Sequence, residues 1–382
     1  MKMVRSLLIA AALLLPIAGC VKTKQLERLG LITAVGYDDK GDIIEGTVVL
    51  HTFESKEENV TQINSASGNT SKGIRQKQNI KTSHNLVSGQ LRVAVYSEET
   101  AGKGLIQLVD TLNRDATIGN LVYLTVSKGT AKNLLKKAGE KEKTNLGTYL
   151  YNLIKQNIKD ELIISPTLHE FNHSFFDPGK DPVLPILKLE EDKVIISGMA
   201  AFKDDRMAGE IDIEKLFYLK TLEDNYESGN LELEIPKEKL KEYIIPLSSE
   251  TEEQKDDPLF ITIDDIRSSK KIRLKDMEDV TFAIDVKLDS RILEVSSDMD
   301  LGNPQVIKAL EKETAVKIKQ EMESMLKRLQ NMESDPIGFG NIYSAHLQRE
   351  KRMTKGEWRN LYKKAEFEVN VENTIIRTGV ID

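Results

Sequence analysis

The first twenty residues constrain this chain more than any other segment. A short basic start, residues 1–5, is followed by a nearly unbroken apolar run over residues 6–17. The run has about a dozen residues, fewer than the ~20 that a helix needs to cross a bilayer. Small residues then lead to a cysteine, which is the only one in the chain. This order is typical of a secretory signal peptide that is removed after export.

The residues around the expected cleavage site indicate a lipid anchor. Ile17, Ala18 and Gly19 form a lipobox directly before Cys20. We expect cleavage to remove residues 1–19 and to leave Cys20 as the mature N-terminus, with a diacylglycerol on its thiol and a further acyl chain, such as palmitate, on its amine. Two or more acyl chains hold a protein durably on a membrane, whereas one chain binds reversibly. The alternative is a chance cysteine in an ordinary signal peptide or in a short uncleaved anchor.

The lone cysteine and the charge balance exclude several classes of protein. One cysteine forms neither an internal disulfide bond nor a cysteine-based zinc site. The chain has 54 Lys and Arg against 61 Asp and Glu, a formal net charge of −7, and cleavage would remove two of the basic residues. An acidic body has no sequence-wide attraction for nucleic acid or for anionic lipid. We therefore expect no nucleic-acid partner, no cofactor, and membrane contact through the anchor and protein partners.

Strand and helix patterns along the chain predict an α+β fold of several domains, with mixed or antiparallel sheets flanked by helices. The predicted strands cover residues 29–38, 43–53, 91–96, 121–126, 194–202, 231–235, 259–263, 282–288 and 367–371. Helical spacing of leucines over residues 100–114 predicts a crossover between two of these strands, and residues 144–158 also look helical. Residues 54–78 have almost nothing to bury, which predicts a mobile loop that leads into a polar helix.

A long helix is the clearest element of the C-terminal half. Asn303 is a suitable N-cap and Pro304 suits the first helical position. One apolar stripe follows, made of Ile307, Leu310, Ala315, Ile318, Met322, Met325, Leu326 and Leu329. We expect this stripe to pack on the sheet that contains residues 282–288.

The proline-rich stretch over residues 166–185 predicts a linker or an irregular cap. We place the main domain boundary just after it, near Glu191. The expected division is a signal peptide over residues 1–19, an N-terminal α+β domain over residues 20–191 and a C-terminal α+β region over residues 192–382. We expect the C-terminal region to divide again, which gives three domains in the body.

Residues 169–173 contain the spacing of a zinc-protease motif. Residues 169–173 read His-Glu-Phe-Asn-His, which on a helix places two imidazoles beside a carboxylate, as a zinc protease requires. Prolines at positions 166 and 178 argue against a helix here, and Glu190 or Glu191 would be a third ligand only by default. We therefore expect exposed or capping histidines, no metal site and no catalytic residue.

Several segments, in their order and spacing, resemble the Ger(x)C family, the lipoprotein C subunits of spore germinant receptors. The segments that carry the resemblance are residues 30–38 after the lipobox, 121–135, 181–185, 198–209, 335–340, Trp358 and 369–379. The chain departs from the family directly after Cys20, where Val21-Lys22-Thr23 replaces the usual tryptophan and acidic residue. A second aromatic residue usually follows the Trp358 position, and Tyr362 takes its place here.

The resemblance implies a three-domain extracytoplasmic body with no enzyme activity. It also implies assembly with two multi-spanning membrane subunits of the same receptor, on the outer face of the inner spore membrane, in a complex that answers small nutrients. One alternative is an extracytoplasmic solute-binding lipoprotein of a transporter, although an aromatic content of 5% with a single tryptophan disfavours an aromatic-lined cleft. The other alternative, a membrane-tethered zinc hydrolase, depends on His169 and His173 alone.

Overall fold

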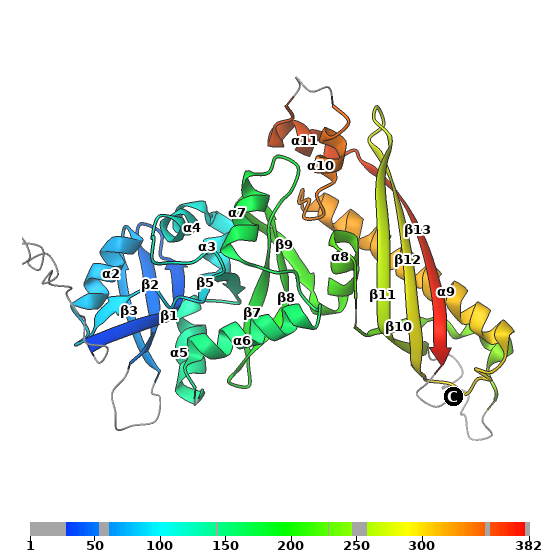
Figure 1. The fold of residues 1–382 in the computed structure, drawn as a ribbon, viewed down its shortest axis with the longest axis horizontal. Coiled ribbons are helices and arrows are strands. Elements are labelled where there is room, and N and C mark those ends of the chain that lie inside the picture. The colour runs from blue at the N-terminus through cyan, green and yellow to red at the C-terminus, as the bar shows by residue number, and fades with distance from the viewer. Residues whose placement is uncertain are drawn as a thin grey trace, which may run out of the picture.

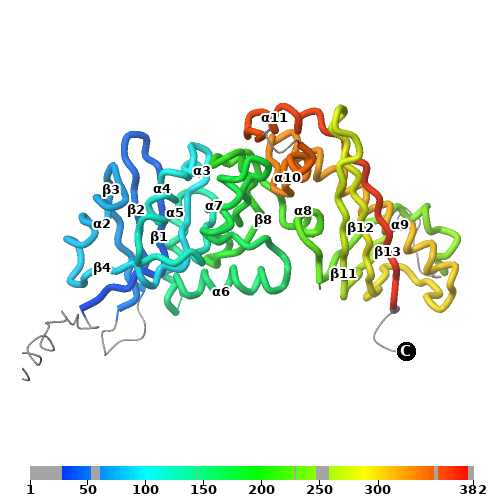
Figure 2. The backbone as a smooth tube through the Cα atoms, turned by 45° about the horizontal axis from the view of Figure 1, so that its top comes forward, coloured from blue at the N-terminus to red at the C-terminus, as the bar shows by residue number. Residues whose placement is uncertain are grey.

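The computed structural model describes residues 28–52, 61–142, 144–227, 229–246, 258–347 and 352–378. Within these ranges the chain forms two β-sheets with helices packed on them, so the predicted α+β fold is confirmed (Figure 1). The first sheet lies at one end of an elongated molecule and the second sheet at the other, as Figure 2 shows from another direction. No helix in the described ranges is long and apolar enough to cross a membrane.

The first sheet contains nine strands in the order β3-β2-β1-β5-β6-β7-β8-β9, with β4 beside the start of β1. They are β1 (Leu29–Asp39), β2 (Ile44–His51), β3 (Gln62–Gly68), β4 (Asn85–Val87), β5 (Val93–Ser97), β6 (Tyr123–Ser127), β7 (Val183–Glu190), β8 (Lys193–Lys203) and β9 (Arg206–Asp212). β1, β5, β6 and β7 run parallel, whereas β2, β3, β8 and β9 join as antiparallel neighbours. The sheet is therefore mixed.

Helices cover both faces of the first sheet. They are α2 (Ser71–Asn79), α3 (Glu98–Lys103), α4 (Ile106–Asn113), α5 (Ala131–Lys141), α6 (Leu146–Lys159) and α7 (Leu168–Phe176). Val93 and Val95 of β5 belong to a core cluster that contains apolar residues of α5 and α6. Ala94 and Tyr96 face the opposite way, into a cluster with residues of α4 and α7. The predicted crossover is confirmed, because α3 and α4 connect the parallel strands β5 and β6.

The described part of the polar segment 54–78, residues 61–78, contains more regular structure than its composition predicts. Residues 62–68 form β3, which pairs with β2, and the predicted mobile loop is wrong for these residues. β3 lies at the edge of the sheet and buries only Ala66 and Gly68. An edge strand needs little apolar surface, so it gives a weak sequence signal. The predicted polar helix is α2, which Thr70 caps.

The proline-rich stretch also contains regular structure, and its assignment as an irregular linker is wrong. α7 lies within it, and β7 begins in it. Pro166 comes before the N-cap residue Thr167, and Pro178 comes after the C-cap residue Asp177. Neither proline ring therefore interrupts the hydrogen bonds of the helix.

The expected boundary near Glu191 falls in the turn between β7 and β8. Glu190 pairs with Lys193, and Val183 at the other end of β7 pairs with Ala201. The first sheet therefore includes residues from both sides of this point. A short 3-10 helix (Ile213–Lys215) and α8 (Leu216–Glu223) then lead to the second sheet. The division of the body into three domains stays a prediction.

The second sheet contains four strands in the order β10-β11-β12-β13. They are β10 (Leu231–Ile235), β11 (Leu259–Asp276), β12 (Thr281–Val295) and β13 (Glu366–Thr378), and two 3-10 helices (Lys237–Lys239 and Lys241–Tyr243) follow β10. β11 and β12 form a long antiparallel hairpin, and β13 runs parallel to β12. Phe282, Ile284, Val286 and Leu288 of β12 are buried while Lys287 is exposed, as the alternating sequence predicts.

Helix α9 (Pro304–Asn331) covers the apolar face of the second sheet (Figure 1). Asn303 caps it, and its side chain accepts a hydrogen bond from the main-chain nitrogen of Gln305. Its stripe residues Ile318, Met322, Met325 and Leu329 are at most 3% exposed and share a core cluster with the inward residues of β12. The predicted helix is confirmed, and six of the eight predicted stripe residues are buried. Ile307 and Ala315 are only half-buried, and Val306 and Thr314 beside them are buried instead. Two short helices, α10 (Phe339–Ser344) and α11 (Lys355–Tyr362), follow where the two parts of the molecule meet.

Candidate functional site: the ionic junction between the two sheets

The structure describes only some of the site residues considered in the sequence analysis. Cys20 and its lipobox, residues 17–19, fall outside the described residues. His169, Glu170 and His173 lie on α7 and are exposed, with the two imidazole centroids 6.4 Å apart. The proline argument against a helix was wrong here, although the exposure of both histidines agrees with the prediction. Among the described residues, no three His, Cys, Asp or Glu side chains are grouped so that they could hold a metal ion.

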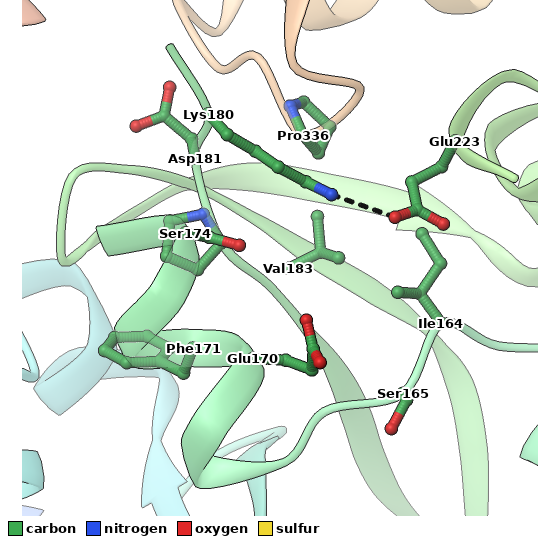
Figure 3. A pocket seen from close by; sticks show the side chains of 11 residues that line it. Ile164, Ser165, Glu170, Phe171, Ser174, Lys180, Asp181, Val183, Glu223 and Pro336 are labelled. Atoms are coloured by element: carbon green, nitrogen blue, oxygen red, sulfur yellow. Dashed lines mark hydrogen bonds and ion pairs between the residues drawn. The ribbon is translucent and has the colours of Figure 1, made fainter. Parts of the chain in front are cut away.

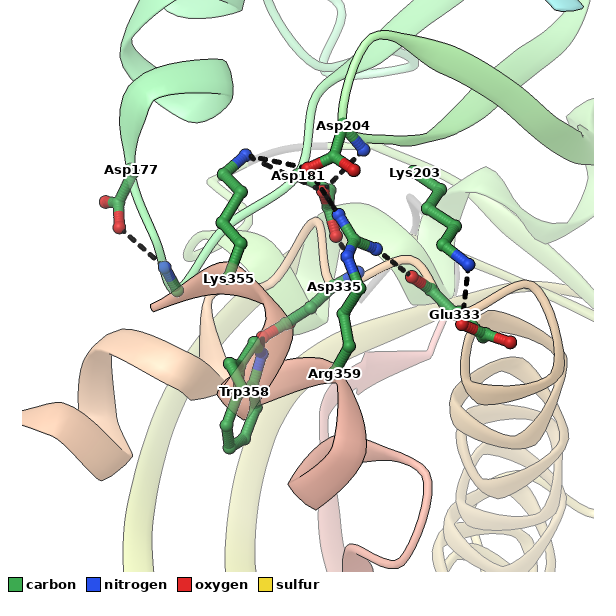
Figure 4. A network of polar contacts seen from close by, with 10 residues as sticks. Asp177, Asp181, Lys203, Asp204, Glu333, Asp335, Lys355, Trp358 and Arg359 are labelled. Atoms are coloured by element: carbon green, nitrogen blue, oxygen red, sulfur yellow. Dashed lines mark hydrogen bonds and ion pairs between the residues drawn. The ribbon is translucent and has the colours of Figure 1, made fainter. Parts of the chain in front are cut away.

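A different group of polar side chains joins the two parts of the molecule (Figure 4). We call it the ionic junction; its members are Asp181, Lys203, Asp204, Glu333, Asp335, Lys355 and Arg359. Asp181 precedes β7, Lys203 is the last residue of β8, and Asp204 lies in the turn between β8 and β9. The other four follow α9 or lie on α11, beside the second sheet. The junction therefore connects residues that are far apart in the sequence.

Asp181 bonds to three segments at once. Its Oδ1 accepts hydrogen bonds from the main-chain nitrogen of Asp204, at 3.0 Å, and from Nη2 of Arg359, also at 3.0 Å. Its Oδ2 accepts one from the main-chain nitrogen of Asp335, at 3.1 Å. In return, the main-chain nitrogen of Asp181 donates to the carbonyl of Asp335, at 2.9 Å. This buried side chain therefore ties the start of β7 to the chain that leaves α9.

Asp335 is buried and receives its hydrogen bonds from N–H groups. Oδ1 accepts from the main-chain nitrogen of Gly338 at 2.8 Å, and Oδ2 accepts from that of Gly340 and from Nε1 of Trp358, both at 3.0 Å. Burial raises the pKa of Asp335 to about 7, with the nearby Asp181 raising it further and the main-chain donors opposing both. The carboxyl group thus fixes the turn that starts α10 and the tryptophan of α11.

Arg359 supplies the positive charge at the centre of the junction. Its Nη1 donates to the carbonyl of Glu333 at 2.9 Å, and its Nη2 lies 2.7 Å from the carboxylate of Asp204 and 3.0 Å from that of Asp181. The side chains of Arg359 and Asp181 are only 13% and 7% exposed. A buried charge that loses its partner is strongly destabilising, so each of these groups depends on the others.

Lysines extend the network on both sides. Nζ of Lys355 lies 3.5 Å from Asp204 and 5.2 Å from the ring centre of Phe175, at the end of α7. Lys203 and Lys363 bind the two oxygens of Glu333 at 2.7 and 2.9 Å. Hydrogen bonds from these two lysines hold the pKa of Glu333 at about 2. Glu333 therefore stays charged at neutral pH and joins the turn after β8 to the end of α9.

Two glycines allow the main chains to approach closely beside this network. A Cβ atom at Gly179 would lie 2.4 Å from the main-chain nitrogen of Asn341, and one at Gly340 would lie 2.5 Å from Cα of Gly179. Real Cβ atoms do not make contacts this short. The side chain of Asn341 also donates to Asp177, at 2.6 Å. Steric fit as well as charge therefore defines the junction.

A small pocket lies next to the junction (Figure 3). Lys180 and Glu223 form an ion pair of 2.9 Å across it, and Glu170 of α7 lies in its wall. Its volume is about 30 Å³, which is room for a water molecule or two. The pocket is too small for a nutrient or for a peptide substrate. The chemistry that the arrangement performs is therefore to hold two parts of a protein together.

The sequence of the chain matches models of one protein family along most of its length. Residues 22–189 match the spore germination protein N-terminal domain, and residues 197–379 match the C-terminal domain described as spore germination B3/GerAC-like. The first match ends and the second begins on either side of the β7–β8 turn. The chain belongs to the Ger(x)C family, whose members are the C subunits of spore germinant receptors.

Individual relatives agree with this assignment. The spore germination protein GerQC of Bacillus cereus is 27% identical, and the match covers 95% of this chain and 96% of that protein. Spore germination protein KC of Bacillus subtilis (strain 168) is 24% identical over 99% of this chain and 97% of its own length. The crystal structure of the GerBC protein has a TM-score of 0.50 and 14% sequence identity, and the match covers 93% of this chain. This last likeness shows that the fold is shared.

The sequence alone did not identify the ionic junction. Residues 181–185, residues 335–340 and Trp358 each support the family resemblance, and the structure brings all three together. The signal that was available is the pair of Asp-Pro steps at residues 181 and 335, together with the single tryptophan. Nothing in their local sequence says that they bond to one another across more than 150 residues.

Proposed function

We propose that this chain is the C subunit of a nutrient germinant receptor, a non-catalytic lipoprotein that spore germination requires. The observation that carries the proposal is the family match, which extends over both halves of the chain and leaves no large part of the body for another function. Two relatives whose sequences match this chain over almost their whole length are named as spore germination proteins. Their names share the role in germination, and the family supports the finer assignment to a receptor subunit.

The proposed anchor is Cys20, which carries a diacylglycerol and places the body on the outer face of the inner spore membrane. The support for it is the lipobox of Ile17, Ala18 and Gly19 directly before the only cysteine. The proposed partners are the two multi-spanning membrane subunits of the same receptor. A body whose two sheets are held together by a buried ionic junction suits such a role, because a partner then meets one defined surface.

Replacing the anchor residue tests this proposal. We expect Cys20→Ala to leave the protein folded but to release it from the membrane fraction, or to leave an uncleaved precursor, because the described fold uses no thiol. Thr23→Ala changes a residue of the same segment outside the lipobox and should leave the protein on the membrane. Mass spectrometry of the mature N-terminus measures the lipid directly. A Cys20→Ala protein that is processed, membrane-bound and active in germination would overturn the proposal.

A further inference from the structure

One region of this acidic chain carries only positive charge. Residues 59–97 contain five Lys and Arg and no Asp or Glu. Most of these cations lie on α2 or directly after it. Nζ of Lys77 donates to the carbonyl of Ser67 at 2.8 Å, and Nζ of Lys81 donates to that of Ser65 at 2.9 Å. Neither ammonium group pairs with a carboxylate of the described residues, so the positive charge at this end of α2 is not neutralised there.

An exposed apolar side chain lies between these two lysines. Ile80 follows the last turn of α2 and is 81% exposed, more than any other large apolar residue in the described part of the chain. The rest of α2 is anchored, because Ile74 and Gln78 are buried against the sheet. An apolar side chain flanked by lysines is the combination that lets a surface helix contact a bilayer: the apolar group enters the interface and the cations meet anionic headgroups.

This end of α2 lies next to the place where the described chain begins. Oδ1 of Asn79 accepts a hydrogen bond from the main-chain nitrogen of Leu86, at 3.1 Å. Leu86 belongs to β4, which pairs with the first residues of β1, and Leu86 itself is paired with Gly30. Adjacent strands are about 4.8 Å apart, which puts Ile80 within roughly 15 Å of Gly30. Figures 1 and 2 both show α2 at this end of the molecule, opposite the second sheet.

The length of the connection to the anchor limits how far the body can lie from the membrane. Only residues 21–27 separate Cys20 from Arg28. A chain of this length spans at most about 29 Å even when fully extended. The surface nearest to Arg28 is therefore the surface that meets the bilayer first, and the end of α2 belongs to it.

We propose that the C-terminal end of α2, with Lys77, Ile80 and Lys81, rests on the anionic phospholipid surface of the membrane that holds the anchor. This inference rests on the proposed lipid anchor at Cys20. Ile80 enters the headgroup region, and the two lysines bind phosphate groups without losing an intramolecular ion pair. The contact fixes which way the body faces, so that the second sheet points away from the membrane.

Lipid quenching of a single label tests the contact on the full, lipidated chain. Ile80→Cys introduces one reactive thiol, because the diacylglycerol on the sulfur of Cys20 blocks labelling there. The labelled protein is reconstituted in vesicles of phosphatidylcholine with about 30% phosphatidylglycerol and a headgroup-linked quencher. We expect quenching to remove about half of the emission or more, as for a side chain at the headgroup level. Phe176→Cys is the matched control, since Phe176 is 71% exposed on α7, and its label should keep its emission.

A second set of variants in the same experiment removes the positive charge of α2. Lys77→Gln with Lys81→Gln should abolish the extra quenching that anionic vesicles give over pure phosphatidylcholine. Lys312→Gln with Lys319→Gln removes the same charge from exposed positions of α9 and should change nothing. Equal quenching at positions 80 and 176, or quenching that ignores the lysines of α2, would overturn the proposal. The proposal would also be overturned if the label at position 80 is not quenched in vesicles but position 80 is protected from labelling in spore membranes. That result would mean that a protein, and not lipid, covers the end of α2.

The wild-type protein separates this inference from the anchor itself. If wild-type protein takes up label at Cys20, or fails to stay with the vesicles, the lipid anchor is refuted. If it takes up no label and stays bound while position 80 remains unquenched, the anchor stands and the α2 contact is refuted.

Discussion

The two sheets of this protein are buried in different ways. In the first sheet, successive residues of β5 point into two separate cores, and all five residues of the strand are buried. In the second sheet, α9 covers one face and the other face carries charged side chains. A strand that is covered twice has a continuous apolar sequence, whereas a strand that is covered once alternates. The sequence patterns of β5 and β12 therefore report the number of layers around each strand.

The difference extends to the charges. Ion pairs link the strands on the open face of the second sheet, such as Lys287 with Glu372 at 2.8 Å and Lys275 with Glu368 at 2.6 Å. All four side chains are more than half exposed, and exposed pairs contribute at most about 1 kcal/mol each. The ionic junction is different, because its central pair of Arg359 and Asp181 is nearly buried. We therefore expect the charges of the ionic junction to contribute more to stability than those on the uncovered face of the second sheet.

The largest loss in the free energy of unfolding should come from an aspartate introduced at a buried position of either sheet. Val95→Asp and Ala94→Asp should both unfold the first sheet, at a cost of more than about 4 kcal/mol, because each buries an unpaired carboxylate. In β12, Val286→Asp should be as damaging, while Lys287→Ala should cost less than about 1 kcal/mol. Chemical unfolding of the four variants measures this. If Ala94→Asp were tolerated, one face of β5 would be open and the contrast between the sheets would fail.

A smaller loss is expected along α9. Ile318→Ala or Leu329→Ala should lower the free energy of unfolding by about 2 to 5 kcal/mol, because each leaves a cavity under the second sheet. Lys319→Ala and Glu323→Ala on the outer face are the controls and should stay within about 0.5 kcal/mol. An unchanged melting temperature in the first pair, with receptor assembly lost, would mean that the stripe binds a partner instead of the sheet.

Mutation of the ionic junction should cause the next largest loss of stability. Arg359→Ala removes the cation that faces Asp181 and Asp204, and should cost about 3 kcal/mol because the buried carboxylate of Asp181 loses its partner. Lys275→Ala removes a comparable charge from the open sheet and should cost about 1 kcal/mol or less. Limited proteolysis between the two sheets measures whether the junction has opened. Equal stability of the two variants would show that the junction is not the connection we describe.

The pH dependence should give the smallest signal. Burial raises the pKa of Asp335 from 3.8 to about 7, so the folded protein keeps a proton that the unfolded chain releases. The contribution of Asp335 to stability is therefore greatest below about pH 4 and falls as the pH rises to about 7. Asp335→Asn should flatten that decline relative to wild type in unfolding curves at several pH values. Glu372→Gln, an exposed control, should leave the slope unchanged, and a decline that survives Asp335→Asn would be due to another group.

Local patterns explain which parts of the fold the sequence predicts. Three-residue and four-residue spacing defines α9, and alternation defines β12, because each signal needs only neighbours along the chain. β3 and α7 are missed for the opposite reason: an edge strand such as β3 buries little, and the prolines around α7 lie just outside it. The amino-acid composition and the spacing of apolar residues do not reveal which strands and helices contact each other.

The ionic junction needs contacts that the sequence does not encode locally. Asp181 and Asp335 are partners across 154 positions, and Asp181 and Arg359 across 178. A single sequence gives each of these residues only as a charged group beside a proline or on a short helix. The predicted absence of a catalytic site and the predicted anchor at Cys20 rest on the sequence and the family, and they stay predictions.

Germination of spores that lack this gene tests the central claim most directly. Deletion spores are exposed to single nutrients, and the fall in optical density is followed for each one. A receptor subunit predicts that the response to a particular nutrient or set of nutrients is lost, that the wild-type gene restores it, and that germination by a non-nutrient trigger is unchanged. Deletion spores that answer every nutrient as wild-type spores do would contradict the assignment.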